Sequence, residues 1–162
     1  MGLRVYWELC GKYGIRRSER WFEETPDKIR LSQDGMYEIW WDKKVITAKA
    51  VEHNRPDVVV IDKDKKRWTM VDFAVPFDAN VVSTESEKTR KYEKLATEVT
   101  RQHRVDTIII PIVVGALGTV SRNLAGWIRR LGINDVLGGL QMSAVIGTSA
   151  ILRKVLSTTA QS

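Results

Sequence analysis

Cysteine and histidine are scarce in this sequence of 162 residues. Cys10 is the one cysteine, so the chain has no internal disulfide framework, and with two histidines besides it cannot form a Cys/His zinc site. The start of the sequence lacks the apolar run of a signal peptide. The longest uncharged stretch, 136–152, reaches only the lower limit for a membrane span and contains several polar residues. We therefore expect no membrane segment, and we interpret this stretch as a helix that packs on the core or on a partner.

Apolar and charged residues occur in globular proportions, 43% and 28%. The length suits a single domain, and neither an internal repeat nor a Pro- or Gly-rich linker divides it. Basic side chains number 26 and acidic ones 20, which gives a net charge of +6. Most of this excess lies in residues 119–162, with five basic groups and one acidic group. A basic domain of this size often binds a polyanion, although a surplus of surface lysine gives the same net charge.

Hydrophobic periodicity predicts an α/β fold with a mixed sheet. Apolar residues among charges in 5–24, including Trp21 and Phe22, predict one or two amphipathic helices. Strands are predicted over 37–41, 45–48, 57–61, 68–75 and 107–114, and further helices over 84–102, 121–131 and 139–157. A strand–helix–strand unit within a hairpin-rich sheet makes the sheet mixed. We divide the single domain, 1–162, into a helical extension (1–35), a core (36–118) and C-terminal helices (119–162).

Two aspartates in the predicted hairpin are the sharpest feature. If its turn centres on Asp64-Lys65, Asp57 lies directly opposite Asp72 on one face of the two strands. Carboxylates this close repel each other unless they are solvated, one is protonated, or a divalent cation lies between them. Asp72 also interrupts an apolar strand, where a buried carboxylate needs a partner or a cation. The pair suits Mg²⁺ or Mn²⁺; alternatively, both are solvated residues at strand ends, and a one-residue register shift would separate them.

Three motifs follow one another in a fixed order. They are Arg55-Pro56-Asp57, then Asp72-Phe73-Ala74-Val75-Pro76, then Glu87-Lys88-Thr89-Arg90-Lys91-Tyr92. This ordered set resembles the restriction-like endonuclease of non-LTR retrotransposons, which belongs to the PD-(D/E)XK nuclease superfamily. Residues 9–15, 51–53, 111–118 and 151–156 are similar to the same region of these retroelement proteins, so the resemblance runs over nearly the whole chain.

The resemblance implies a PD-(D/E)XK restriction-endonuclease-like core, a mixed central sheet flanked by helices. Asp57, Asp72 and the backbone carbonyl of Phe73 would then bind Mg²⁺ or Mn²⁺. The superfamily usually has a lysine two residues after the second acid, but here that position is Ala74. In the retrotransposon group the lysine stands on the following helix, where both Lys88 and Lys91 match. The candidates for an accessory role are Glu19, Glu23, Glu52, His53 and Tyr92; His53 would contact phosphate, orient a ligand, or serve only the fold.

The resemblance further implies a DNA endonuclease that leaves a 5′-phosphate and a 3′-hydroxyl, the group that primes reverse transcription in a retroelement. We expect such an enzyme to act in the nucleus, with DNA, an upstream reverse transcriptase and zinc-knuckle region, and a second copy of the chain as partners. Candidate contacts with the DNA backbone are Arg55, Arg90, Arg122, Arg129, Arg130, Arg153 and Lys154.

Two other functions stay open at this point. A nucleic-acid-binding module that has lost cleavage is favoured by Ala74. A dimerisation domain is favoured by the apolar surface of residues 136–152 and by Trp40-Trp41. Adjacent tryptophans on a strand face opposite ways, so one of the two is expected to be exposed or at an interface.

Overall fold

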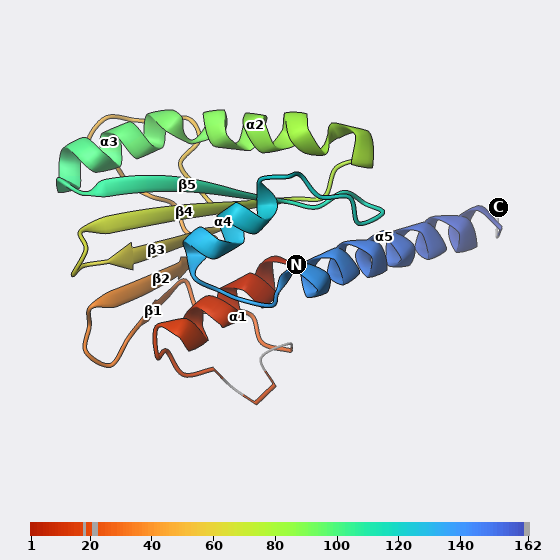
Figure 1. Ribbon diagram of the computed structural model, residues 1–162, viewed down its shortest axis with the longest axis horizontal. Helices are drawn as coiled ribbons and strands as arrows, with labels where there is room; N and C mark the ends of the chain where they lie inside the picture. Colours follow the sequence, from red (N-terminus) through yellow and green to blue (C-terminus); the bar gives the residue numbers. More distant parts are fainter. Residues whose placement is uncertain (18, 21–22, 161–162) are drawn as a thin grey trace.

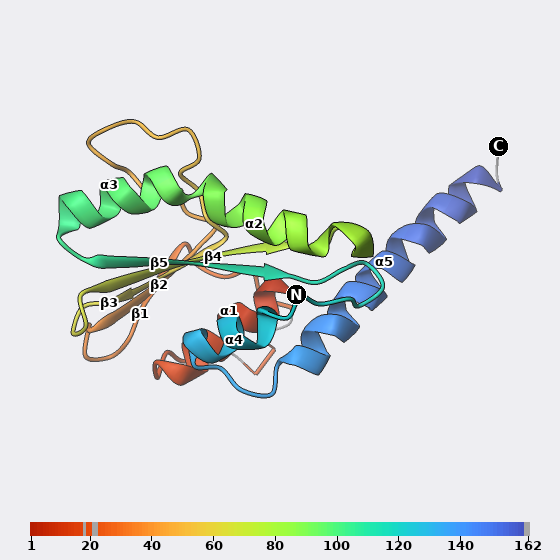
Figure 2. The ribbon, with the colours of Figure 1, turned by 45° about the horizontal axis from the view of Figure 1, so that its top comes forward.

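The computed structural model describes residues 1–17, 19–20 and 23–160, and a five-stranded sheet lies at its centre with helices on both faces (Figures 1 and 2). The strands, in their spatial order, are β1 (Ile29–Leu31), β2 (Tyr37–Trp41), β3 (Val58–Asp62), β4 (Arg67–Ala74) and β5 (Asp106–Val113). The helices are α1 (Gly2–Lys12), the 3₁₀ turn η1 (Asp78–Asn80), α2 (Val81–Lys91), α3 (Glu93–His103), α4 (Leu124–Leu131) and α5 (Leu137–Thr159). Strands β1 to β4 pair antiparallel and β5 runs parallel to β4, so the predicted mixed α/β sheet is confirmed.

Alternation of side chains along the strands divides the interior into two hydrophobic cores. Val58 and Val60 point to the face that α1, α4 and the start of α5 cover. Val59 and Ile61 point to the other face, where they pack against Leu95 and its neighbours in α2 and α3. Both faces are therefore buried, which explains why β3 is an unbroken apolar run. Helix α1 belongs to the first core and is not an extension added to it.

The predicted helix over 5–24 is shorter in the structure. Helix α1 ends at Lys12, because Gly14 adopts a φ of +66° and the Ile15 amide bonds back to the Cys10 carbonyl at 2.8 Å. The helical extension predicted over 1–35 contains α1 but also β1, which forms one edge of the sheet. Ser18, Trp21 and Phe22 fall outside the described residues.

The predicted strand over 45–48 is also wrong, because β2 pairs directly with β3 and residues 42–57 form a loop between them. The Val45 amide donates to the Asn54 carbonyl within this loop at 2.7 Å. The Ala48 amide donates to the side chain of Gln102 at 2.8 Å. Val45 is buried in the core beneath α3, so its apolar character serves packing and not strand pairing.

The single helix predicted over 84–102 is divided into α2 and α3 at Tyr92. This residue has φ −103° and ψ 3° and interrupts the helical hydrogen bonding. Its side chain is 1% exposed and packs in the core beneath the two helices. The break allows an aromatic ring to enter the face of the sheet where the two aspartates lie.

The adjacent tryptophans face opposite sides of the sheet, as predicted. Trp40 lies edge-on to Trp68 with ring centroids 5.3 Å apart, and Trp41 lies edge-on to Tyr6 at 5.2 Å. Both tryptophans are half-buried. Of the two alternatives, exposure does not hold, because side chains of both cores pack against the tryptophans.

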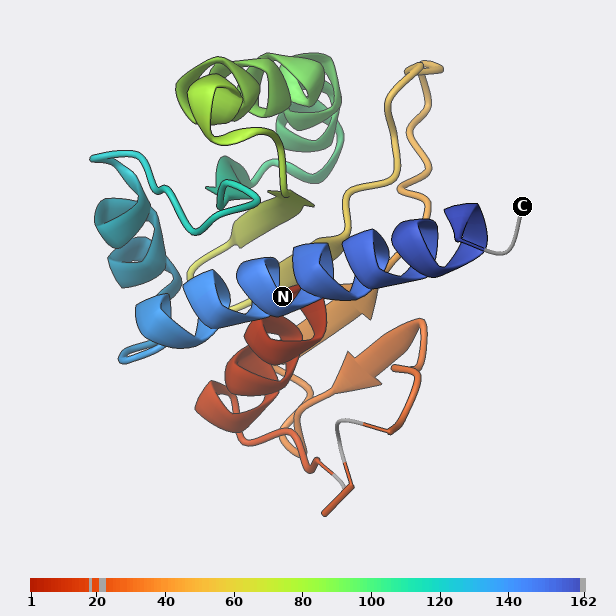
Figure 3. The ribbon, with the colours of Figure 1, turned by 90° about the vertical axis from the view of Figure 1, so that its right-hand side faces the viewer.

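Helix α5 begins on the body of the protein and then extends away from it (Figures 1 and 3). Its first half packs on the core through Leu140 and Ala144. Its second half is exposed and carries the large apolar side chains Ile151, Leu152, Val155 and Leu156. Within the described residues, no helix combines the length and the apolar character that a membrane crossing needs.

We expect Gly115→Ala to destabilise the protein by about 1–3 kcal/mol, because overpacking at a filled position has this cost. An added Cβ would overlap the carboxylate of Asp78 and approach its Cα to 3.1 Å. That carboxylate accepts hydrogen bonds from the amides of Leu117 and Thr119, both at 3.0 Å, and so holds the loop after β5. Gly126→Ala in α4 is the matched control, since nothing lies within 4 Å of its added Cβ.

Urea unfolding monitored by circular dichroism measures both variants. Gly126→Ala should raise the free energy of unfolding by about 0.5–1 kcal/mol, because alanine is the better helix former. Equal effects of the two substitutions would contradict the close contact at Gly115.

Candidate functional site: a facing pair of aspartates

The pairing of β3 with β4 places Asp57 against Asp72. Val58 pairs with Val71 and Val59 with Met70, so continuing the register by one residue sets Asp57 opposite Asp72. The predicted register of the hairpin is confirmed. The turn closes through Asp62, whose carboxylate accepts the Lys65 amide at 2.9 Å.

Asp57 stands just before β3 and is held by the opposite strand. Its carboxylate accepts a hydrogen bond from the Phe73 amide at 2.7 Å. The N–H and C=O of one strand residue point toward the same neighbouring strand, so the Phe73 carbonyl also faces the beginning of β3. The backbone of Phe73 and the carboxylate of Asp57 are therefore in direct contact.

Asp72 is 3% exposed and has two partners from α2 and its end. The Lys88 ammonium lies 2.6 Å from Oδ2 of Asp72. The Tyr92 hydroxyl lies 3.0 Å from Oδ1 and 3.1 Å from the Arg55 carbonyl, and it donates toward these acceptors. The lysine therefore neutralises the charge of Oδ2 in the free protein.

The two carboxylates share an unfavourable environment. The pKa of Asp57 is raised to about 6, chiefly by burial and also by the charge of Asp72, against the opposing effect of the Phe73 amide. Burial and the charge of Asp72 also raise the pKa of Tyr92, so this phenol keeps its proton and acts as a donor. One lysine faces two acids here, and the pair is therefore suited to a cation of higher charge.

The site fits a hard divalent cation in the character of its donors. Mg²⁺ binds oxygen ligands and commonly takes one or two carboxylates, with water and substrate phosphate completing its shell. Asp57, Asp72 and the Phe73 carbonyl supply such oxygens, and Asp72 is 3% exposed. No third His, Cys, Asp or Glu joins them in the described part of the chain, so phosphate and water would have to complete the shell.

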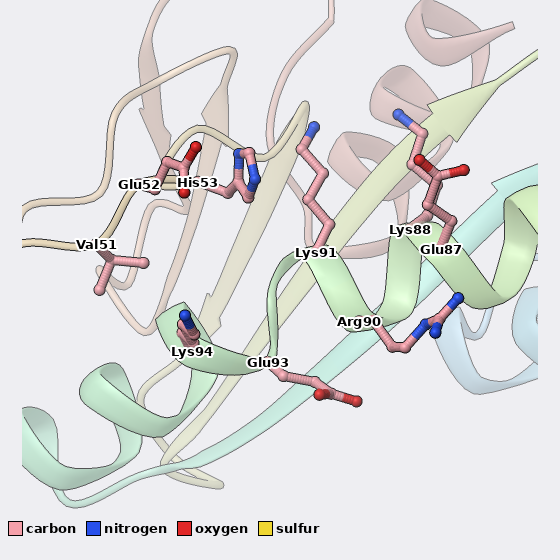
Figure 4. A pocket seen from close by; sticks show the side chains of 9 residues that line it. All are labelled: Val51, Glu52, His53, Glu87, Lys88, Arg90, Lys91, Glu93 and Lys94. Carbon is pink, nitrogen blue, oxygen red and sulfur yellow. The ribbon is translucent and has the colours of Figure 1, made fainter.

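The structure brings together some of the other predicted residues and separates the rest. Glu52 and His53 line a pocket with Lys88 and Lys91, beside the aspartates (Figure 4). Glu19 and Glu23 lie instead in the segment between α1 and β1. Strand β1 is the edge strand of the sheet on the side away from β5. Both glutamates are exposed, and Glu23 pairs with Arg20 at 3.6 Å. The structure does not bring either one to the acid pair, because their segment contacts β1, where Arg30 donates to the Arg16 carbonyl at 3.0 Å.

The predicted DNA contacts do not form one surface around the acid pair. Arg90 lies on α2, on the same side of the sheet as the aspartates, whereas Arg122, Arg129 and Arg130 lie on or just before α4, on the opposite side (Figure 2). Arg153 and Lys154 are exposed on the projecting part of α5. The distribution of these side chains leaves α2 and α3 as the source of positive charge nearest the site.

Asp42 is a residue that the sequence analysis missed. It follows β2, and its carboxylate binds Arg55 at 2.6 Å and Lys28 at 3.2 Å. The Asp42 amide donates to the Asp57 carbonyl at 2.7 Å. This arrangement ties both ends of the 42–57 loop together and fixes the approach of the chain to Asp57. In the sequence Asp42 has the character of an ordinary turn residue, and no regular spacing links it to Asp57 or Asp72.

No protein-family model matches this sequence, and no curated protein matches it. The resemblance to the retrotransposon nucleases therefore stays a prediction. Its support is the geometry of Asp57, Asp72 and Lys88 described above.

We expect Asp57→Asn to stabilise the protein at pH 7.5. A carboxyl whose pKa is raised in the folded state binds more protons there than in the unfolded chain, so stability is lost as pH rises from about 4 through 6. A shift of about two units corresponds to about 3 kcal/mol, and partial exposure reduces the expected gain to about 1–2 kcal/mol. Asparagine keeps an oxygen for the Phe73 amide.

Urea unfolding at pH 4.5 and 7.5 measures the difference between Asp57→Asn and the unchanged protein. The gain should be smaller at pH 4.5, where the native carboxyl is already protonated. Asp64→Asn, in the exposed hairpin turn, is the control and should change stability little at either pH. A loss of stability at pH 7.5 in Asp57→Asn would contradict the raised pKa.

Proposed function

We propose that this protein is a metal-dependent DNA endonuclease, which hydrolyses a phosphodiester bond to a 5′-phosphate and a 3′-hydroxyl. The observation that carries the proposal is the facing pair of the half-buried Asp57 and the buried Asp72, with Lys88 at 2.6 Å from Asp72. An acid pair with a lysine is the set of groups that the resemblance to PD-(D/E)XK nucleases requires. Because α2 supplies the lysine, alanine at position 74 leaves the set complete.

The residues of the site have distinct tasks in this proposal. Asp57 and Asp72, with the Phe73 carbonyl, would hold Mg²⁺ or Mn²⁺, and the bound ion would supply Lewis acidity and a water of lowered pKa. Tyr92 holds Asp72 through Oδ1 and so orients the other oxygen toward the site. Lys88 offsets the charge of the acids in the free protein and is placed to offset the charge of a phosphate. By the resemblance, the 3′-hydroxyl would serve an associated reverse transcriptase as a primer.

A supercoiled-plasmid assay at low salt, with Mg²⁺, Mn²⁺ and EDTA in separate arms, tests this function. We expect nicking in the two metal arms only, and a loss of at least about 100-fold in Asp72→Ala, since removing one charge-stabilising group commonly costs this much. Asp64→Asn, from the same hairpin, should nick like the unchanged protein and controls for a contaminating nuclease. Circular dichroism of Asp72→Ala checks that it folds.

The same assay separates the enzyme from the binding module. A protein that retards DNA in a gel but nicks it with neither metal would be a nucleic-acid-binding module that has lost cleavage. Equal nicking by Asp72→Ala and the unchanged protein would rule out this site as the source of the activity.

A second candidate function, self-association, is favoured by the projecting half of α5. Ile151 and Val155 follow Leu140 and Ala144 on one face of the helix, since their spacing stays close to whole helical turns. Ile151 and Val155 face solvent, while Leu140 and Ala144 pack on the core. A second copy that brings its own α5 would cover this face symmetrically, as in a two-fold dimer.

Size-exclusion chromatography with light scattering measures the mass of the protein in solution. We expect the mass of two chains, and of one chain after the joint change Ile151→Glu and Val155→Glu. Ile46→Glu is the control, because this side chain is 79% exposed in the 42–57 loop and far along the chain from α5. A single-chain mass at high protein concentration would contradict self-association.

A further inference from the structure

A pocket of about 660 Å³ lies beside the acid pair, between the 42–57 loop and the junction of α2 with α3. Val51, Glu52 and His53 line it from the loop, and Lys88, Lys91 and Lys94 from the helices. In Figure 4 the side chain of Lys91 extends from α2 alongside the imidazole of His53. The two groups come from elements that are separated along the chain and meet only in the folded protein.

The lysines and the histidine of this pocket differ in their contacts. Lys88 is paired with Asp72. In the described part of the chain, the side chains of Lys91, Lys94 and His53 make neither an ion pair nor a hydrogen bond. The Lys91 ammonium lies 4.8 Å from the centre of the Tyr92 ring, which holds it in place without neutralising it. These groups are therefore hydrogen-bond donors without acceptors.

The acidic residues around the pocket leave the space between Lys91 and His53 open. Glu93 extends away from it, Glu87 lies beside Lys88, and Glu52 lies on the far side of His53 from Lys91 (Figure 4). An ammonium and an imidazole that converge on one space suit an anion with several acceptor oxygens, and phosphate is such an anion. Lys91 stands three residues after Lys88, about one helical turn or roughly 5 Å further along α2.

We propose that Lys91 and His53 form a phosphate-binding site for the nucleic-acid backbone, next to the phosphate that faces Asp57 and Asp72. That the phosphate facing Asp57 and Asp72 is the one to be cut rests on the proposed function. The anion site formed by Lys91 and His53 does not depend on it. Lys88 then serves the acid pair and Lys91 serves binding, which separates two lysines that are equivalent in the sequence. Lys94, three residues after Lys91, also lines the pocket.

Binding of a fluorescein-labelled DNA duplex, measured by anisotropy in EDTA, tests the site without any cleavage. We expect Lys91→Gln and His53→Ala each to weaken binding by about 3- to 10-fold, and the slope of log Kd against log salt to fall by about one for Lys91→Gln. Lys91→Arg should restore the slope. The double variant should lose less than the product of the single losses, because both groups contact one phosphate.

Matched variants and probes make each outcome decisive. Lys44→Ala, an exposed lysine of the same loop outside the pocket, should bind like the unchanged protein. Lys88→Ala should lose nicking while keeping most of its affinity. Duplexes with and without a 5′-phosphate should bind equally; a requirement for the terminal phosphate would overturn the assignment to the internal backbone.

Failure of this site and failure of the nuclease give different results. If the unchanged protein nicks plasmid but Lys91→Gln and His53→Ala bind duplex normally, the anion site is wrong and the nuclease stands. If no metal supports nicking but Lys91→Gln and His53→Ala lose affinity and Lys44→Ala does not, the anion site is supported. The protein is then a nucleic-acid-binding module and not a nuclease. Absence of duplex binding by the unchanged protein would overturn the site as well.

Discussion

The antiparallel register between β3 and β4 is the constraint on which the rest of the structure depends. It sets Asp57 opposite Asp72 and, by the alternation of side chains, sends Val58 to one core and Val59 to the other. It also leaves the far edge of β4 free for a parallel partner. The crossover to that partner is α2 and α3, so the same topology that completes the sheet carries Lys88 over the aspartates.

This arrangement concentrates unfavourable electrostatics at one point of an apolar strand. Asp72 is buried, Asp57 has a raised pKa, and a single lysine faces both. Folding alone gives no reason to keep two carboxylates there, because one asparagine would satisfy the Phe73 amide without the repulsion. A site that binds a divalent cation and a phosphate gives such a reason, since the ligands then supply the missing positive charge and use the oxygens.

The break between α2 and α3 joins the acid pair to the pocket beside it. Tyr92 leaves the helical line, enters the core and bonds Asp72, while its ring lies beneath the ammonium of Lys91. One residue thus orients a carboxylate and positions a cation. Because Lys88 and Lys91 differ by about 60° in direction around the helix, one reaches the aspartates and the other the loop that carries His53.

The sequence by itself determined the hairpin and the opposition of its aspartates, because these depend on neighbours within 16 residues and on a side-chain period of two. It also determined the mixed sheet, through the order strand–helix–strand along the chain. Only the tertiary structure decided which lysine meets Asp72 and that Glu19 and Glu23 lie elsewhere. It also decided that 45–48 is a loop and that a predicted helix breaks at Tyr92. These features depend on contacts between distant segments, such as Tyr92 with Arg55 and Ala48 with Gln102, which override local propensity and leave no periodic pattern in the chain.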